Sequence, residues 1–403
     1  MKLHDLNGQF LHLERWVNNP KYSATAQYSE VGKEYHPRHG DADFPLPVFM
    51  LRKEDVIVHA AAPERAIRRA IIQGDRVSFP CHPDALSEFD GCRGFSSPER
   101  HERVAPTSST RTVLFLDTNE RFMVKLHLNK RISRFIRRLT ASSVFHSIQI
   151  SRECERLSAL PTCPKEFAFL PESIGIVHKQ KGLGFVVREF LPRPAKESPG
   201  VLVPFFALYS RDERAQSDAP LLSQLASAAG MEPLNYFVRY ILRPFMKCWA
   251  FAFLEGGILF ESHAQNTLLE LDEHLIPRRI VQRDFQSIPV DPAVRKAKGL
   301  HLQFRKHVIG REDYPRLIEH SLIFDHFIGD YLFGAFAEFF QREHGVSNEK
   351  FFLEVKKSFR EYIPHAVERE FFPKGHVTFT DSFHDNICPL LYLHEAPLCR
   401  MSY

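Results

Sequence analysis

The stretch from residue 257 to residue 290 constrains the fold of this chain more than any other. It reads GILFESHAQNTLLELDEHLIPRRIVQRDFQSIPV, with a polar cluster at 261–266, an apolar run at 267–271 and a polar pair at 283–284. Apolar β-forming segments beside such clusters usually carry the polar side chains to one end of a sheet, where a ligand can meet them. The stretch therefore predicts strands whose ends form one half of a nucleotide site.

Length and composition place the chain among ordinary globular proteins. Its 403 residues exceed one typical core and predict two or three packed subdomains. A hydrophobic fraction of 44% and a charged fraction of 25% exclude a largely disordered or fibrous chain. A net charge of +4 is mild, so composition does not favour nucleic acid or a membrane surface as a partner.

Cysteine usage and the apolar segments indicate a cytoplasmic protein. The seven Cys are scattered without a C-x-x-C pair, which favours neither a disulfide framework nor a zinc ribbon. The first residues lack the apolar core of a signal peptide. The most apolar later stretch, 248–254, is too short to span a bilayer.

The first half of the chain alternates between strand and helix patterns. Apolar runs at 112–116 and 122–126 flank DTNE and predict a hairpin, and residues 166–190 predict a second strand pair with KQKGLG as its turn. Apolar residues at helical spacing predict a helix over 132–150. Proline and charge predict a long loop or lid over 193–218.

The second half is more helical. A periodic segment at 233–254 predicts a helix that Pro244 divides. A further helix is predicted over 321–343 and ends at Gly345, because large apolar residues recur every four positions, at Phe324, Ile328, Leu332, Phe336 and Phe340. Residues 365–403 are expected to be irregular.

Two segments upstream of residue 257 carry groups that bind anions. SSTRT at 108–112 places hydroxyls around Arg111, which together can hydrogen-bond to phosphate, although a polar loop is the commoner explanation of such a pentapeptide. KLHLNKRISRFIRR at 125–138 is basic throughout, and a helix from residue 132 would put Ser133 in its first turn. A solvated basic face is the usual explanation of such a run, and nucleic-acid binding is disfavoured because Phe135 is its single aromatic residue.

The opening stretch adds ligands for a nucleotide and its metal. Glu261 and Asp284 are carboxylates of the kind that hold Mg²⁺ together with substrate phosphates. His263, Gln265 and Asn266 can hydrogen-bond to a triphosphate or a base.

Taken in order, these stretches match a family pattern. S-x-R-T, a strand that ends in Lys-Leu, I-S-x-x-x-R, E-x-H-x-Q-N and R-D-F together resemble the ATP-binding palm of the NRPS-independent siderophore synthetases of the aerobactin-synthetase (IucA/IucC) type. Ser133 stands where that family usually has Thr. The matching residues are Ser109, Arg111, Thr112, Lys125, Ser133, Arg137, His263, Gln265, Asn266 and Asp284.

The resemblance implies an α+β fold with an antiparallel β-sheet palm and flanking helical subdomains, arranged as fingers, palm and thumb. It implies a ligase that uses ATP and magnesium to activate a carboxylate of a citrate-like polyacid as an acyl adenylate. The acyl group then passes to an amine, hydroxylamine or alcohol in siderophore biosynthesis. Arg111, Lys125, Arg137 and His263 would be catalytic, Asp284 and Glu261 would hold the metal, and the protein would form a homodimer.

The N-terminal third matches less well. YHPRH at 35–39 and PCHP at 80–83 keep only the His-Pro cores of the family motifs, so His36, His39 and His82 are candidates for binding the carboxylate substrate or for a structural role. The chain is shorter than the family, with the shortfall expected before residue 35. The predicted division is a reduced N-terminal subdomain at 1–106, an ATP-binding sheet and basic helix at 107–232, and a palm with a C-terminal helical subdomain at 233–403.

Two other functions stay open on sequence grounds. A degenerate family member could bind nucleotide, or a siderophore or its precursor, without ligation. A kinase-like phosphotransferase would explain a strand lysine, a later His-x-x-Asn and a following Asp. However, no glycine-rich loop precedes Lys125, and no Asp lies between His263 and Asn266 to act as the base.

Overall fold

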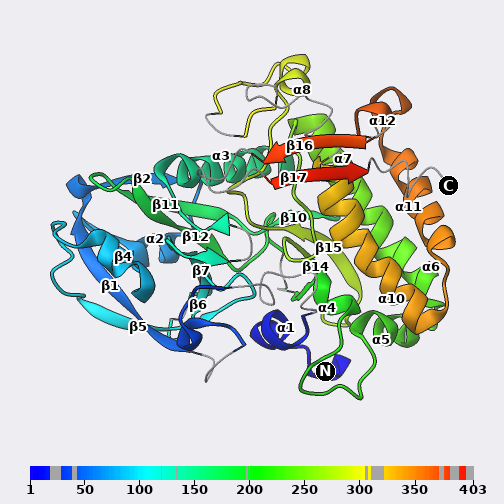
Figure 1. Ribbon diagram of the computed structural model, residues 1–403, viewed down its shortest axis with the longest axis horizontal. Coiled ribbons are helices and arrows are strands. Elements are labelled where there is room, and N and C mark those ends of the chain that lie inside the picture. The colour runs from blue at the N-terminus through cyan, green and yellow to red at the C-terminus, as the bar shows by residue number, and fades with distance from the viewer. Residues whose placement is uncertain are drawn as a thin grey trace.

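The structure is a computed structural model, which describes residues 1–18, 29–38, 43–118, 120–132, 135–196, 198, 200–304, 307–309, 322–371, 376–381 and 390–395. A large sheet occupies one side of the molecule and helices α7, α10 and α11 occupy the other, with a smaller sheet between them (Figure 1). The α+β class with an antiparallel sheet is therefore confirmed. None of the helices described is both long and apolar enough to cross a bilayer.

The large sheet has nine strands in the order β2-β11-β12-β7-β6-β5-β1-β4-β3, and every neighbouring pair is antiparallel. Both hairpins predicted from the sequence are present, as β6 with β7 and β11 with β12. The strands are β1 Phe44–Arg52, β2 Val56–Ala60, β3 Ile72–Gln73, β4 Arg76–Pro80, β5 Arg100–Pro106, β6 Thr112–Phe115, β7 Phe122–Lys125, β11 Glu172–His178 and β12 Leu183–Glu189.

The long helix α3, Ala141–Ser158, covers β11 at close range. All seven residues of β11 are buried, as expected for a strand with neighbours on both edges and cover on its faces. Gly175 makes the close approach possible, because a Cβ there would lie 2.5 Å from the Val144 side chain.

The smaller sheet has the order β10-β15-β14-β13. The strands are β10 Phe167–Phe169, β13 Val201–Pro204, β14 Thr267–Leu271 and β15 Pro277–Gln282. The pair β14–β15 is antiparallel and forms the strand pair predicted within residues 257–290, while β10 joins β15 in parallel. This sheet brings the two polar clusters of the opening stretch, at 261–266 and 283–284, to the same end.

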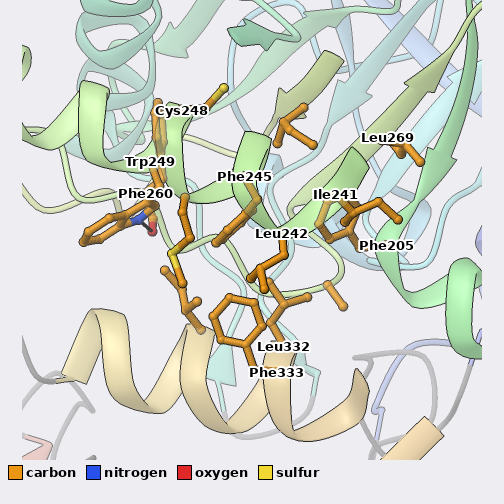
Figure 2. Packing of buried hydrophobic residues seen from close by; sticks show 14 of the residues in the cluster. Phe205, Ile241, Leu242, Phe245, Cys248, Trp249, Phe260, Leu269, Leu332 and Phe333 are labelled. Carbon is orange, nitrogen blue, oxygen red and sulfur yellow. Dashed lines mark hydrogen bonds between the residues drawn. The ribbon is translucent and has the colours of Figure 1, made fainter. Parts of the chain in front are cut away.

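Helices pack on the outer face of the smaller sheet around α7, Arg243–Gly256. Pro244 lies in the first turn of α7 and follows the π-helical segment η7, Val238–Leu242, so the predicted division at this proline is confirmed. Trp249 is fully buried and donates from Nε1 to the carbonyl oxygen of Phe260 at 3.0 Å. Figure 2 shows Phe333 facing Phe245 across this core, with the ring centroids 5.7 Å apart.

The remaining elements are short helices and two small hairpins. The hairpins are β8 Arg131–Ile132 with β9 Phe135–Ile136, and β16 His376–Asp381 with β17 Leu390–Glu395. The helices are η1 Leu3–Asp5, α1 Phe10–Trp16, η4 Lys33–Tyr35, η5 Lys53–Asp55, α2 Arg65–Ile71, η6 Pro83–Phe89, α4 Phe205–Tyr209, α5 Leu221–Ala228, α6 Pro233–Phe237, α8 Pro292–Ala297, η8 Leu322–Phe333, α10 Gly334–His344, α11 Asn348–Tyr362 and α12 His365–Phe371.

The predicted start of a helix at residue 132 was wrong. Arg131–Ile132 pairs with Phe135–Ile136 as β8 and β9, and α3 begins at Ala141, where the hydroxyl of Thr140 accepts from the Ser143 amide at 3.5 Å. This cap satisfies an amide of the first turn, so the helix starts nine residues later than the apolar spacing suggests. Arg137 consequently lies in a loop and not on a helical surface.

Two segments predicted as irregular contain regular structure. The loop expected over 193–218 holds β13 and α4, because the apolar run VLVPFFALY at 201–209 is buried after its first residue. The tail expected to be irregular holds α12 and the hairpin β16–β17. The helix predicted over 321–343 is confirmed from Leu322 onward, with its first part π-helical, and it ends at Gly345, which is left-handed with φ of 65°.

Candidate nucleotide site

Lys125 ends β7 in the middle of the large sheet, and its neighbours place more charge on the same face. It lies opposite Val186 on β12, so Arg188 two residues further on points to the same side. Glu172 on β11 pairs directly with Arg188, and its Oε1 accepts from the guanidinium at 2.5 Å. Strand register therefore assembles two buried cations and a buried carboxylate.

Asp284 connects this face to the smaller sheet. It follows β15 with a left-handed φ of 70°, and its carboxylate pairs with the Lys125 ammonium, while Arg188 lies 3.7 Å away. Burial alone would raise the pKa of Asp284, but Lys125 and Arg188 outweigh it and hold the pKa well below its usual range. The Asp284 side chain keeps 23% exposure against 3% for Lys125, so the carboxylate is the more accessible member of the pair.

Arg111 enters from the loop between β5 and β6. Its guanidinium donates to the carbonyl oxygen of Arg137 at 2.5 Å and to Oε1 of Gln286 at 2.7 Å. Burial, together with the positive charge of Arg137, lowers the pKa of Arg111 to about 9, although Asp284 and Glu172 oppose the change. The turn that presents it depends on Thr110, with φ of 67°, and on Ser109, whose hydroxyl accepts from the Thr112 amide at 3.2 Å.

Thr112 and Arg137 complete this wall of the site. Thr112 pairs with Lys125 across the β6–β7 hairpin, and its buried hydroxyl has no hydrogen-bond partner among the residues described. Burial lowers the pKa of Arg137, against the opposing charges of Asp284 and Glu261, so its guanidinium lies within electrostatic range of both carboxylates. Ser133 lies outside the described residues.

The polar cluster at 261–266 forms a tight turn before β14. Asn266 donates from its side-chain amide to the carbonyl oxygen of Glu261 at 3.2 Å, and Gln265 donates to the Ser108 hydroxyl at 3.0 Å. His263 accepts the Gln265 backbone amide at Nδ1, 3.2 Å away, so its proton sits on Nε2. Burial lowers the pKa of His263 to about 4, which leaves a neutral ring at physiological pH.

Glu261 and Asp284 are the two carboxylates of the site that could hold a hard divalent cation, and their charges affect each other. Burial raises the pKa of Glu261 to about 7 and the charge of Asp284 reinforces this, while the Ser287 hydroxyl donates to Glu261 at 3.0 Å. Magnesium is commonly held by one or two carboxylates, with phosphates and water as its other ligands. The described residues contain no group of three or more His, Cys, Asp or Glu side chains placed to hold a metal.

Glu261→Gln is expected to stabilise the fold at high pH and to have less effect at low pH. The pKa of Glu261 rises from an ordinary 4.5 to about 7 in the folded protein. The stabilisation from the bound proton is therefore complete below pH 4.5 and is lost as the pH rises through about 7. Thermal unfolding between pH 5 and pH 8, without nucleotide or metal, measures this. An unfolding temperature of the variant that stays below wild type at pH 8 would contradict the raised pKa.

Sequence reasoning missed several buried charges that build the site. Arg188 and Glu172 were taken only as parts of strands, and Glu14 in α1 was not considered. Arg283 was noted beside Asp284, yet its guanidinium turns away to Glu14 at 2.7 Å. The available signal was a charged residue among apolar neighbours, as in GFVVRE at 184–189 and FLHLERW at 10–16. Charged residues in such surroundings are buried only when they are paired.

The histidines of the N-terminal third have visible local roles. The ring of His82 packs on Tyr35 and Phe44, with centroids 5.1 Å and 5.9 Å away, and its Nδ1 accepts the Asp84 amide at the start of η6. Burial lowers the pKa of His82 to about 4. His36 accepts the Arg38 amide at Nδ1, 3.2 Å away. His39 lies outside the described residues.

Two family models match the chain. The model of the IucA / IucC family matches residues 88–210, which include β6, β7 and Arg188. A model described as ferric iron reductase FhuF-like transporter matches residues 234–398.

Curated relatives and solved structures agree with the first of these models. An NRPS-independent siderophore synthetase of Rhizopus delemar is 25% identical over 236 residues, which are 55% of this chain and 36% of that protein. An L-2,3-diaminopropanoate–citrate ligase of Staphylococcus aureus is 28% identical over 218 residues, 49% of this chain and 35% of that protein. The matched part of the chain thus spans about a third of the length of either relative.

The fold extends the resemblance over nearly all of the chain. Aerobactin synthetase IucC from a hypervirulent pathotype of Klebsiella pneumoniae matches with a TM-score of 0.72 and 16% identity, over 91% of this chain and 72% of that one. ATP-bound aerobactin synthetase IucA from the same source matches with a TM-score of 0.68 and 14% identity, over 93% and 75%. In its central sequence and in its fold, the chain resembles the NRPS-independent siderophore synthetases of the IucA/IucC type.

Proposed function

We propose that this protein is an ATP- and magnesium-dependent ligase of siderophore biosynthesis. It activates a carboxylate of a citrate-like polyacid as an acyl adenylate and passes the acyl group to an amine, hydroxylamine or alcohol. The main observation behind this proposal is that Arg111, Lys125 and Arg188, from separate parts of the chain, all lie near Asp284. Further support comes from relatives named as a siderophore synthetase and a citrate ligase, and from the similar fold of an ATP-bound synthetase.

The electrostatics suit transfer of an adenylyl group. In adenylation, a substrate carboxylate oxygen attacks the α-phosphorus, the bond to the bridging oxygen breaks, and pyrophosphate leaves with that electron pair. Lys125, Arg111 and Arg137 would stabilise the charge that grows on the phosphates, because water screens buried charges poorly. The neutral ring of His263 can donate from Nε2 without adding charge.

Magnesium would be held by Asp284 and Glu261 and would neutralise phosphate charge. Two contacts hold these carboxylates in place. The Ser287 hydroxyl donates a hydrogen bond to Glu261, and Lys125 forms an ion pair with Asp284. The attacking nitrogen or oxygen would next bond to the acyl carbon and give up its proton, while AMP leaves with the electron pair of the broken carbon–oxygen bond. We further propose that the enzyme acts in the cytoplasm, and as a homodimer as the resemblance implies.

Incubation with ATP, magnesium, citrate and hydroxylamine is expected to release AMP and pyrophosphate in equal amounts. Other polycarboxylates and amines, tested as a panel, would identify the preferred pair, and reactions without acid or without acceptor are the controls. Release of ADP in place of AMP would indicate a phosphotransferase. Nucleotide binding without either product, across the whole panel, would indicate a binding protein and overturn the ligase proposal.

A further inference from the structure

The N-terminal helix α1 supplies a carboxylate that joins the two halves of the nucleotide site. Glu14 is fully buried, and its Oε2 accepts from the Ser108 amide at 3.0 Å and from the Ser108 hydroxyl at 2.5 Å. Its Oε1 forms an ion pair with Arg283 at 2.7 Å. The next residue, Arg15, donates to the carbonyl oxygen of Pro106 at 3.0 Å. The helix is therefore docked on the strand end that leads to Arg111.

Further hydrogen bonds close this link into a ring. Gln265 donates from its side chain to the Ser108 hydroxyl at 3.0 Å, and its carbonyl oxygen accepts from Arg283 Nε at 2.7 Å. Ser108 follows β5 of the large sheet, whereas Gln265 and Arg283 flank β14 and β15 of the smaller one. Glu14 thus contacts both sheets at the point where they face each other, and the place of α1 between them can be followed in Figure 1.

The anchored residues lie just before the two that would bind the nucleotide. Ser108 lies three residues before Arg111, and Arg283 directly precedes Asp284. Each loop also contains a non-glycine residue with positive φ, Thr110 at 67° and Asp284 at 70°. Such backbone is unfavourable on its own and persists only where its surroundings fix it. The ring through Glu14 provides that fixation on both sides.

We propose that Glu14 is a positioning residue, which sets Arg111 and Asp284 at the separation that one ATP triphosphate with its cation requires. The proposal rests on the ATP site of the proposed function, and Glu14 itself touches no nucleotide. A buried carboxylate suits the task because it accepts several hydrogen bonds in fixed directions while it neutralises a buried arginine. Loss of the charge would free Arg283, and through it the loop that carries Asp284.

Glu14→Gln tests this, because glutamine keeps the shape and an acceptor for Ser108 but loses the charge that holds Arg283. The dissociation constant of ATP with magnesium, measured by calorimetry without acid substrate, is expected to rise about ten- to a hundredfold, the loss typical of small misplacements in a site. Glu270→Gln is the matched control. It removes an equally buried carboxylate from an arginine pair, with Arg279 at the other end of β14–β15, and should leave ATP affinity within twofold.

Ser108→Ala provides a milder variant in case Glu14→Gln unfolds, since it removes only the shared hydroxyl. It should weaken ATP binding in the wild-type background and add nothing in the Glu14→Gln background. Unchanged ATP affinity in Glu14→Gln, or in Ser108→Ala where the former unfolds, would overturn the positioning role alone. A wild-type protein that binds no ATP would instead overturn the proposed function together with this inference.

Discussion

Replacing Lys125 with alanine is expected to slow pyrophosphate release about a hundredfold to a thousandfold, the range found when one preorganised charge stabiliser is removed. Lys125 is buried and lies closer to Asp284 than Arg188 does. Burial lowers the pKa of Lys125 to about 8, so the ammonium is mostly protonated at pH 7. The loss should appear mainly in kcat, because the charge on the phosphates grows in the transition state.

Lys179→Ala is the control for this variant. Lys179 lies exposed in the turn between β11 and β12, so its removal should leave the rate unchanged. Circular dichroism and the unfolding temperature would show that Lys125→Ala is folded, since Arg188 remains to face Asp284. A folded Lys125→Ala variant that retains a third of the wild-type rate would remove Lys125 from the reaction.

Glu172→Ala should have the largest effect on stability, a loss of about 3–5 kcal/mol in the free energy of unfolding. Glu172 is fully buried, and its two oxygens accept from Arg188 and, at 3.3 Å, from the Phe285 amide. Removing it leaves the buried guanidinium of Arg188 without its main counter-ion and frees the residue after Asp284. Denaturant titration of the wild type and the variant measures the difference.

An exposed glutamate shows the effect of lost charge without burial. Glu54 pairs with Arg52 and Arg93, but its side chain is 61% exposed. Glu54→Ala should therefore change the free energy of unfolding by less than about 1 kcal/mol. Equal losses in the two variants would mean that the Glu172–Arg188 pair contributes no more than a surface pair.

The part of the fold that sequence predicted rests on local signals. DTNE between two apolar runs fixed the β6–β7 hairpin, and with it the placement of Lys125 at a strand end. Apolar β-runs around the clusters at 261–266 and 283–284 predicted their meeting, which the β14–β15 pair produces. The order of the motifs suggested the nucleotide site, and the structure brings Arg111, Lys125 and Asp284 together.

What sequence could not supply were the long-range partners of buried charges. Glu14 and Ser108 are separated by 94 positions, and Glu172 and Phe285 by 113. No periodicity connects such residues, because their contact depends on which strands become neighbours. The wrong start of α3 has the opposite cause. Apolar spacing at 132–139 fits a helix, but the Thr140 cap and the pairing of Arg131 with Ile136 override it.

The ion pair between Lys125 and Asp284 joins residues that are 159 positions apart. During synthesis, Lys125 therefore leaves the ribosome long before Asp284 does. Ribosomes deliver the N-terminal strands first. Arg111, Lys125 and Arg188 therefore emerge before Asp284, and in that interval Glu172 is the carboxylate available to Arg188. Lys125 and Arg111 gain the opposing charge of Asp284 when β15 docks beside β10. A nascent chain shorter than this holds a basic cluster but no binding site. Nucleotide affinity would thus depend on complete synthesis and on packing of the two sheets against each other. A measurement of that affinity would detect partly folded or truncated protein.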